Sequence, residues 1–189
     1  MKAIVVYDSR YGNTEKISMD LANGLRQNGI EVTCARTTET KPEELRNFDL
    51  VAIGGPTEWH SASSKTKEFL AKLKQVDLKG KFGFAFDTKL DSWWAGDASD
   101  SIENVLESCG AQMIMSNASA FVNSPKEKKE RVEKSVENPD ETKEERKRRK
   151  LEQKEMKRGS IVLKEGMEQK FEQLGIQLGR KLLGQLVST

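Results

Sequence analysis

Residues that bind soft metals are scarce in this sequence. Among its 189 residues there are two cysteines and one histidine, and Cys34 and Cys109 belong to no CxxC or Cys/His cluster. Zinc and iron–sulfur sites need several such ligands at close spacing. We therefore expect no metal centre. Two reduced thiols are also typical of a protein of the cytoplasm.

Long apolar runs are absent as well. The longest unbroken run extends only from Ala3 to Tyr7. A membrane-spanning helix needs about 20 apolar residues, and the core of a signal peptide needs about 7 to 15. We therefore expect a cytoplasmic protein without a membrane span or an export signal.

Charge is nearly balanced in number, with 32 Lys and Arg against 30 Asp and Glu, but it is unevenly distributed. Residues 126–158 contain 14 basic and 10 acidic residues, which leaves 18 basic and 20 acidic residues elsewhere. SPKE at 124–127 and NPDE at 138–141 are typical of helix starts. These patterns predict a charged helical hairpin at 124–159, inserted within a single domain that spans residues 1–189.

Outside this segment, short β-branched stretches alternate with helical patterns. Ile17, Leu21 and Leu25 recur at helical spacing before Gly29 ends the first helix. Such alternation indicates βαβ units around a parallel sheet, so we predict an α/β fold with a doubly wound sheet. The expected strands are 2–7, 30–35, 49–55, 81–86 and 112–122, and the expected helices are 14–28, a short one from 42, 65–74, 99–108 and 163–186.

The most informative stretch is the turn from the first strand into the first helix. Backbone N–H groups at a helix N-terminus carry partial positive charge. Ser9 and Thr14 add hydroxyl groups, and Gly12 lets the backbone approach a ligand closely. This predicts a phosphate-binding loop, although a helix cap without a ligand would leave the same pattern. The GxxxxGK[ST] and GxGxxG patterns of triphosphate and dinucleotide sites are both missing.

All three tryptophans lie in two loops that follow strands. Trp59 belongs to the loop 54–61, and Trp93 and Trp94 belong to the loop 87–96. Doubly wound sheets bind ligands at the carboxyl ends of their strands. The pattern favours a planar ring stacked on indoles with its phosphate in the first loop, which is the geometry of flavin mononucleotide (FMN). Indoles that only cover the end of the sheet are the alternative.

These segments resemble the flavodoxin family. SRYGNT at 9–14 is similar to its phosphate-loop pattern [T/S]-x-[T/S/Y]-G-x-T, GGPTEW at 54–59 to its second loop, and FDTKLDSWWAG at 86–96 to its third. The resemblance covers residues 1–122 and the last helix. It implies a five-stranded sheet of order 2-1-3-4-5, non-covalently bound FMN and one-electron transfer at low potential. The family also tolerates insertions at the fifth strand, where the charged hairpin is predicted.

All three loops contribute expected cofactor-binding residues, whereas no catalytic or metal-binding residue is expected. The set is Ser9, Arg10, Tyr11, Gly12, Asn13, Thr14, Pro56, Thr57, Glu58, Trp59, His60, Asp87, Thr88, Lys89, Trp93, Trp94 and Gly96.

Two features depart from the usual pattern of this family, and the charge of the third loop adds a further expectation. Arg10 and Tyr11 replace small hydroxylic residues, so the phosphate loop carries a charge. His60 stands where flavodoxins often have a glycine whose peptide flips towards the reduced ring; a non-glycine residue resists φ > 0, so weaker semiquinone stabilisation is expected. Four acids between Asp87 and Asp100 face only Lys89, which would make the flavin a stronger reductant.

Three functions remain open. The favoured one is an electron carrier that shuttles single electrons between redox partner proteins. An FMN-dependent NAD(P)H:quinone oxidoreductase would need a nicotinamide pocket, for which no insertion after the fourth strand is visible. A non-catalytic binding module is the third. Because glutamates surround RKRRK at 146–150, a solvated helix is favoured there; docking of an acidic redox partner is the alternative, and nucleic acid is not expected to bind. The protein is expected to be monomeric.

Overall fold

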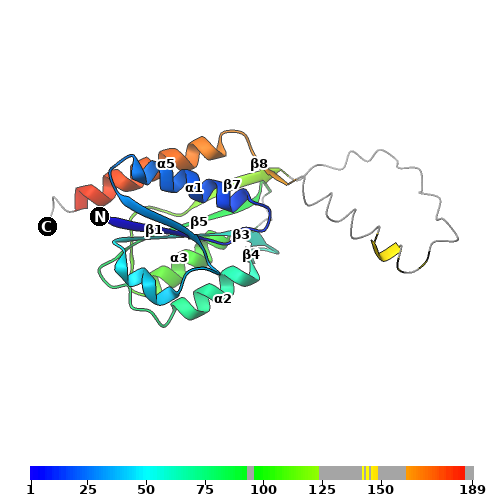
Figure 1. The fold of residues 1–189 in the computed structure, drawn as a ribbon, viewed down its shortest axis with the longest axis horizontal. Coiled ribbons are helices and arrows are strands. Elements are labelled where there is room, and N and C mark those ends of the chain that lie inside the picture. The colour runs from blue at the N-terminus through cyan, green and yellow to red at the C-terminus, as the bar shows by residue number, and fades with distance from the viewer. Residues whose placement is uncertain (93–95, 124–141, 143, 145, 149–160, 186–189) are drawn as a thin grey trace.

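The computed structural model describes residues 1–92, 96–123, 142, 144, 146–148 and 161–185. A mostly parallel sheet lies between two helical layers (Figure 1). One layer consists of α1 (Asn13–Arg26) and α5 (Met167–Gln185), and the other of α2 (Ser64–Leu73) and α3 (Ala98–Ser108). The predicted α/β fold with a doubly wound sheet is confirmed. Apart from residues 142, 144 and 146–148, the hairpin predicted at 124–159 lies outside the described residues.

The sheet follows the order β2-β1-β3-β5-β7-β8. In this order, neighbouring strands are parallel as far as β7, and β8 pairs antiparallel with β7. This is the predicted order 2-1-3-4-5, with β5 and β7 as its fourth and fifth strands. The bounds are β1 (Lys2–Tyr7), β2 (Glu31–Arg36), β3 (Leu50–Glu58), β4 (Ser61–Ala62), β5 (Phe82–Leu90), β6 (Gln112–Met113), β7 (Ala118–Asn123) and β8 (Val162–Leu163).

The central strands are buried on both faces because alternate residues point to opposite helical layers. Val6 packs in the cluster that contains Phe69 of α2. Val5 packs in the other cluster, with Leu21 of α1 and Phe171 of α5. Strands covered on both sides have continuous apolar sequences, as β1 does. This packing fixes the carboxyl ends of β1, β3 and β5 side by side.

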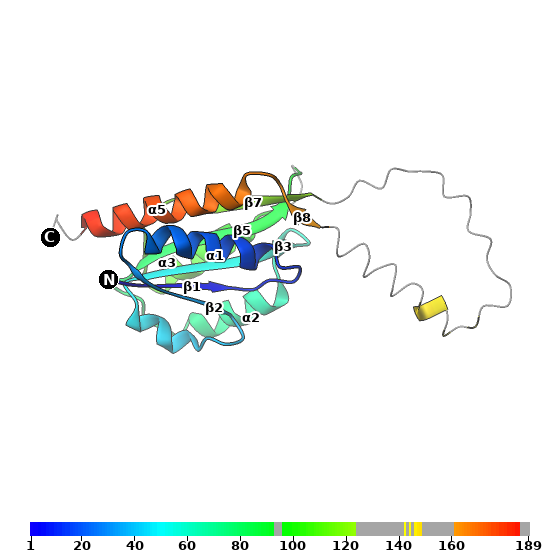
Figure 2. The same ribbon diagram turned by 45° about the horizontal axis from the view of Figure 1, so that its top comes forward.

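Helices α1 and α5 lie side by side on one face of the sheet and touch through their backbones (Figures 1 and 2). A Cβ on Gly24 would lie 2.0 Å from the carbonyl oxygen of Glu172, and a Cβ on Gly175 would lie 2.2 Å from that of Leu21. No larger residue fits either position without a shift of the helices. The apolar pattern predicts that α5 packs on the body, but it says nothing of this glycine contact.

Three strands differ from the prediction. The fourth strand, expected at 81–86, continues as β5 to Leu90 because its last residues pair with β7. The prediction ends the third strand before Pro56, but β3 continues to Glu58 because its last residues pair with β4. The expected strand 112–122 divides into β6 and β7. Between them the chain leaves the sheet, and the side-chain amide of Asn117 donates a hydrogen bond to Asp100 of α3.

Helix boundaries also differ. The last helix begins at Met167 rather than at 163, because Val162–Leu163 form β8 and Gly166 turns the chain with a φ of 81°. The short helix expected from Pro42 is the 3-10 helix η1 (Pro42–Asn47). Among the described residues, no helix combines the length and the apolar character that crossing a membrane requires.

Candidate functional site

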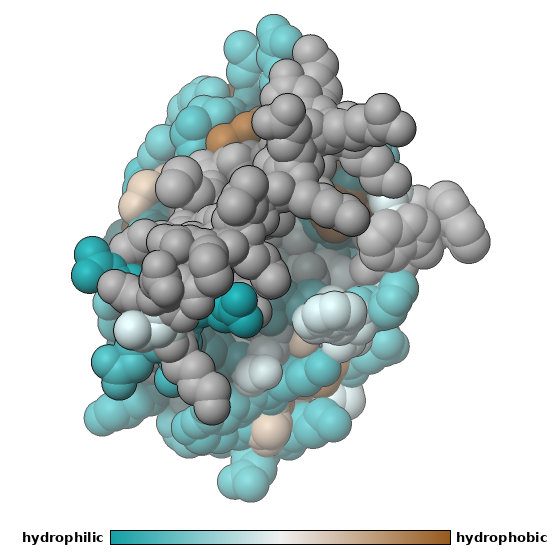
Figure 3. Space-filling model, turned by 90° about the vertical axis from the view of Figure 1, so that its right-hand side faces the viewer, coloured by the Kyte–Doolittle hydropathy of each residue, from teal (hydrophilic) through white to brown (hydrophobic). Residues whose placement is uncertain are grey.

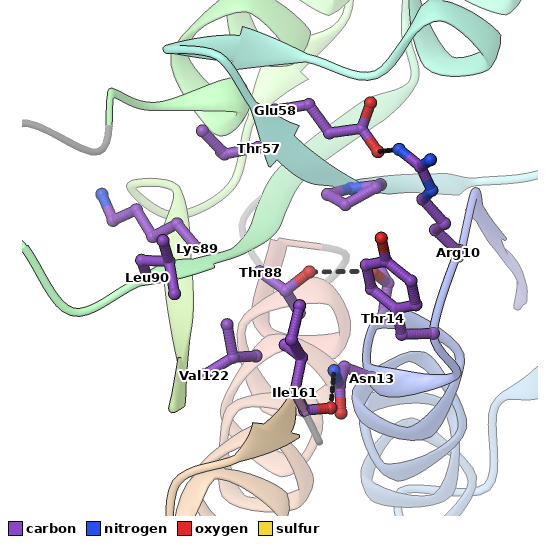
Figure 4. A pocket seen from close by; sticks show the side chains of 12 residues that line it. Arg10, Asn13, Thr14, Thr57, Glu58, Thr88, Lys89, Leu90, Val122 and Ile161 are labelled. Carbon is purple, nitrogen blue, oxygen red and sulfur yellow. Dashed lines mark hydrogen bonds and ion pairs between the residues drawn. The ribbon is translucent and has the colours of Figure 1, made fainter. Parts of the chain in front are cut away.

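A cavity of about 170 Å³ opens at the carboxyl ends of β1, β3 and β5 (Figure 4). The chain leaves β1 for α1 on one face of the sheet and leaves β3 for α2 on the other, so the cavity lies at a topological switch point. It is lined by Arg10, Tyr11, Asn13, Thr14, Pro56, Thr57, Glu58, Thr88, Lys89, Leu90, Val122 and Ile161.

The loop between β1 and α1 presents hydrogen-bond donors at this edge. Gly12 precedes α1 with a left-handed φ of 82°, and no side-chain hydrogen bond caps this helix end. The first N–H groups of such a helix need an acceptor from elsewhere. The hydroxyl oxygens of Thr14 and Thr88 are 2.9 Å apart and buried. The Ser9 hydroxyl oxygen is buried and has no hydrogen-bond partner in the described part of the chain.

This donor set fits a phosphate group. An uncapped helix N-terminus attracts anions, and an anion would give Ser9 the partner that a buried hydroxyl requires. A Cβ on Gly12 would meet no atom within 4 Å, so it is the left-handed backbone, and not lack of space, that favours glycine there. The phosphate-binding loop predicted from the sequence therefore has the local geometry that this role requires.

The second loop turns sharply beside the cavity. Trp59 and His60 both have positive φ, 47° and 68°, and the Trp59 side chain is 95% exposed. The backbone of His60 bridges to Gly96, where a Cβ would lie 2.4 Å from the His60 Cα. His60 therefore adopts in this loop the positive φ that a non-glycine residue was expected to resist, and its backbone contacts Gly96 there. The effect on the flavin stays a prediction.

A buried carboxyl lies behind the cavity wall. Asp87 is fully buried at the end of β5, and its Oδ2 accepts hydrogen bonds from the Thr57 hydroxyl at 2.6 Å and the Ala98 N–H at 2.9 Å. Burial raises the pKa of Asp87, and the nearby charge of Asp97 adds to the rise. Through these two hydrogen bonds, Asp87 links the end of β3 to the start of α3. Thr57 also lines the cavity.

Two of the four acids of the third loop pair with cations. Asp97 lies 2.6 Å from the ammonium group of Lys89, and Asp91 pairs with Lys164. Burial alone would raise the pKa of Asp97, but the hydrogen bonds from Lys89 and Ser99 lower it below its usual value. Lys164 therefore offsets part of the excess of acid counted along the sequence, and the predicted electrostatic effect on reduction stays a prediction.

The structure brings nine of the predicted residues together around the cavity. They are Arg10, Tyr11, Asn13, Thr14, Pro56, Thr57, Glu58, Thr88 and Lys89. Of the others, Ser9 lines an adjoining cavity, Gly12 starts α1, Asp87 lies beneath the wall, and Trp59, His60 and Gly96 lie outside the lining. Trp93 and Trp94 lie outside the described residues. Whether each residue binds a cofactor stays a prediction.

Three lining residues were not predicted: Leu90, Val122 and Ile161. Leu90 and Val122 are register partners at the ends of β5 and β7, and a longer expected fourth strand would have indicated them. Ile161 gives no signal in the sequence. The Asn13 side-chain amide donates to its carbonyl oxygen at 3.0 Å, which holds the start of β8 against the phosphate loop (Figure 4).

Comparison with known proteins agrees with the geometry. A family model described as Flavodoxin matches residues 5–147. Flavodoxin from Aquifex aeolicus is 32% identical over 100 residues, which cover 51% of this chain and 54% of the relative. NAD(P)H dehydrogenase (quinone) from Archaeoglobus fulgidus is 28% identical over 114 residues, covering 45% of this chain and 60% of the relative.

Solved structures share the fold at low sequence identity. Oxidised flavodoxin 1 from Bacillus cereus superposes with a TM-score of 0.69 at 15% identity, covering 95% of this chain and 98% of that one. The chain spans about a third to three fifths of the length of the curated relatives at the head of the comparison.

Proposed function

The chain belongs to the flavodoxin family, which implies a flavin cofactor, and we propose that it binds FMN and carries single electrons between redox partners. The observation that carries this proposal is the uncapped start of α1. The loop from Ser9 to Thr14 presents anion-binding groups beside a cavity that continues along the ends of β3 and β5; Thr14 lines this cavity, and Ser9 lines the adjoining one. That arrangement suits a long ligand with one anionic end.

The residues of the chain would bind and orient the cofactor. The first N–H groups of α1 and the hydroxyl of Ser9 would hold the phosphate, while Thr57 and Thr88 line the middle of the cavity. The loops after β3 and β5 would flank the ring, with Asp87 fixing their relative position. A bound flavin supplies the electron chemistry itself.

Binding of FMN is tested by spectroscopy and by a matched pair of variants. We expect the purified protein to show the absorption bands of an oxidised flavin and to lose them on reduction. Gly12→Ala and Gly29→Ala both place a Cβ at positive φ, 82° and 75°, with no neighbour within 4 Å. Each should lower the free energy of unfolding by about 1–2 kcal/mol.

Only Gly12 lies in the proposed phosphate loop, whereas Gly29 follows α1 at its other end. We therefore expect Gly12→Ala alone to weaken FMN binding, by roughly tenfold. A colourless protein that takes up no added FMN would contradict the proposal. Equal loss of affinity in both variants would show that the phosphate lies elsewhere.

A second candidate is an FMN-dependent NAD(P)H:quinone oxidoreductase, because two of the curated relatives bear names of this kind. Such an enzyme would oxidise NADH or NADPH when given a quinone, whereas an electron carrier would not catalyse this reaction without a partner protein. Steady-state oxidation of NADPH by the purified, FMN-loaded protein separates the two. Turnover at several per second or faster, in the range of ordinary enzymes, would favour the enzyme.

Docking of redox partners is also part of the proposal. The face at the carboxyl ends of the strands is mainly hydrophilic where Figure 3 shows described residues. Polar surfaces suit the brief encounters of electron-transfer proteins. We propose that the basic residues of 124–159 guide an acidic partner to this face, in which case the rate of electron transfer falls with added salt.

A further inference from the structure

Arg10 and Glu58 form an ion pair between two loops of the site. Arg10 follows β1 and Glu58 ends β3, and Nη1 of Arg10 lies 2.9 Å from Oε1 of Glu58 (Figure 4). The two side chains are 47% and 28% exposed. The guanidinium also lies over the ring of Tyr11, 5.5 Å from its centroid. Arg10 thus belongs to the phosphate loop, but its guanidinium group points to Glu58 at the end of β3.

The pair stands between two cavities. Both side chains line the cavity of about 170 Å³ and a second cavity of about 270 Å³, and Ser9 and Lys65 are among the other residues of the second. Sites for ligands of nucleotide size usually measure roughly 300–1,000 Å³. Neither cavity reaches this range alone, whereas the two together do. Separation of Arg10 from Glu58 would join them.

Two cations line the first cavity, and they differ in how firmly they are held. Lys89 is only 17% exposed and lies 2.6 Å from Asp97. The Arg10 pair is more exposed, and exposed pairs contribute little because water screens them. A phosphate monoester carries a charge of about −1.5 to −2 and can accept two N–H groups of one guanidinium. It should therefore compete well with the single contact to Glu58.

We propose that Arg10 exchanges Glu58 for the phosphate of FMN when the nucleotide binds. This inference rests on the proposed function. Arg10 then raises the affinity for the phosphorylated flavin, and Glu58 lowers it by competing for the same guanidinium. Riboflavin, which lacks the phosphate, gains nothing from the exchange. The pair therefore adjusts the preference for FMN over riboflavin that the N–H groups of α1 and the Ser9 hydroxyl would already give.

A purely structural pair would behave differently. If the pair only held the phosphate loop to β3, loss of either side chain would loosen the site and weaken the binding of both flavins. The exchange instead requires opposite effects of the two losses, and it requires that these effects appear with FMN alone. The two explanations thus predict opposite changes in FMN affinity when the Glu58 carboxylate is lost. They also differ in whether the binding of riboflavin changes.

Calorimetric titration of the flavin-free full chain with FMN and with riboflavin tests the exchange. We expect Arg10→Gln to raise the Kd for FMN about tenfold, or about 1.4 kcal/mol. Glu58→Gln should lower it about threefold, and both variants should leave riboflavin within about twofold. Lys2→Gln is the matched control, since Lys2 also pairs at the surface, with Glu31, and lines neither cavity. Circular dichroism checks that each variant is folded.

Three results would overturn the exchange. One is a shift of FMN affinity in the same direction in both variants, and another is an equal shift for FMN and riboflavin. The third is an increase in FMN affinity on Glu58→Gln that persists when Arg10→Gln is also present, because Glu58 would then act by direct repulsion of the phosphate. A wild-type chain that binds neither flavin would instead overturn the proposed function, and this inference with it.

Discussion

The burial of Asp87 makes the free energy of unfolding depend on pH. The pKa of Asp87 is raised above its usual 3.8, chiefly by burial, so the folded protein keeps this proton after the unfolded chain has lost it. Between those two values the folded state binds more protons, and the free energy of unfolding falls as pH rises. The lowered pKa of Asp97 acts in the opposite direction, because its contribution is lost as pH falls below 3.8 through the folded pKa.

We expect Asp87→Asn to remove the loss of stability that develops above pH 3.8. The substituted amide is uncharged in both the folded and the unfolded state, so it adds no pH dependence. Melting temperatures of both proteins between about pH 4 and 8 measure the effect. Asp20→Asn is the matched comparison, since the pKa of Asp20 is also raised by burial but this side chain lies on α1, outside the cavity. Parallel curves for wild type and Asp87→Asn would contradict the prediction.

At the scale of elements, the contact of α1 with α5 positions the phosphate loop. The loop runs directly into α1, and α1 rests on α5 where Gly24 meets Glu172 and Gly175 meets Leu21. Because these atoms belong to the backbone, they cannot move aside as the end of a flexible side chain can. The angle of α1, and with it the direction of its N–H groups, depends on two glycines.

We expect Gly24→Ala to lower the free energy of unfolding by about 1–3 kcal/mol, as overpacking does. Gly184→Ala, near the end of α5, should leave it unchanged or raise it by up to about 1 kcal/mol, because a Cβ there meets nothing within 4 Å. Urea denaturation of both variants measures the difference. If Gly24→Ala is as stable as Gly184→Ala, the two helices can separate at no cost.

At the scale of the whole molecule, the sequence predicted the sheet order and most of the cavity lining. The strands and the lining depend on local signals, namely apolar strands such as β1 and loops whose residues favour turns and helix starts. The order of the strands was implied by the resemblance to the flavodoxin family. The rest depends on partners distant in sequence. Ile161 reaches the site through Asn13, Asp91 is offset by Lys164, and His60 keeps a positive φ against Gly96. Counts along the chain cannot detect such contacts.

The segment 124–160 enters and leaves the domain at one point. Asn123 and Val162 are direct partners in the β7–β8 pair. A short Gly-Asn-Gly linker in place of 124–160, with Ile161 kept, can therefore join the strands as a hairpin. We expect the free energy of unfolding to rise by up to about 2 kcal/mol, since each halving of a loop lowers the cost of closing it by about 0.6 kcal/mol.

Thermal unfolding and FMN titration of this shortened chain, with a ten-residue Gly/Ser linker as control, check the expectation. If the segment docks partners, both linkers should also weaken the dependence of electron-transfer rate on salt. A drop in stability of several kcal/mol with both linkers would show that the segment supports the domain.

The reliance of α1 on α5 has a consequence for synthesis. The two helices stand far apart along the chain, so α1 leaves the ribosome long before the helix on which it rests. Until then the amides that face the cavity lack their final direction. Capture of the cofactor should therefore follow the synthesis of α5.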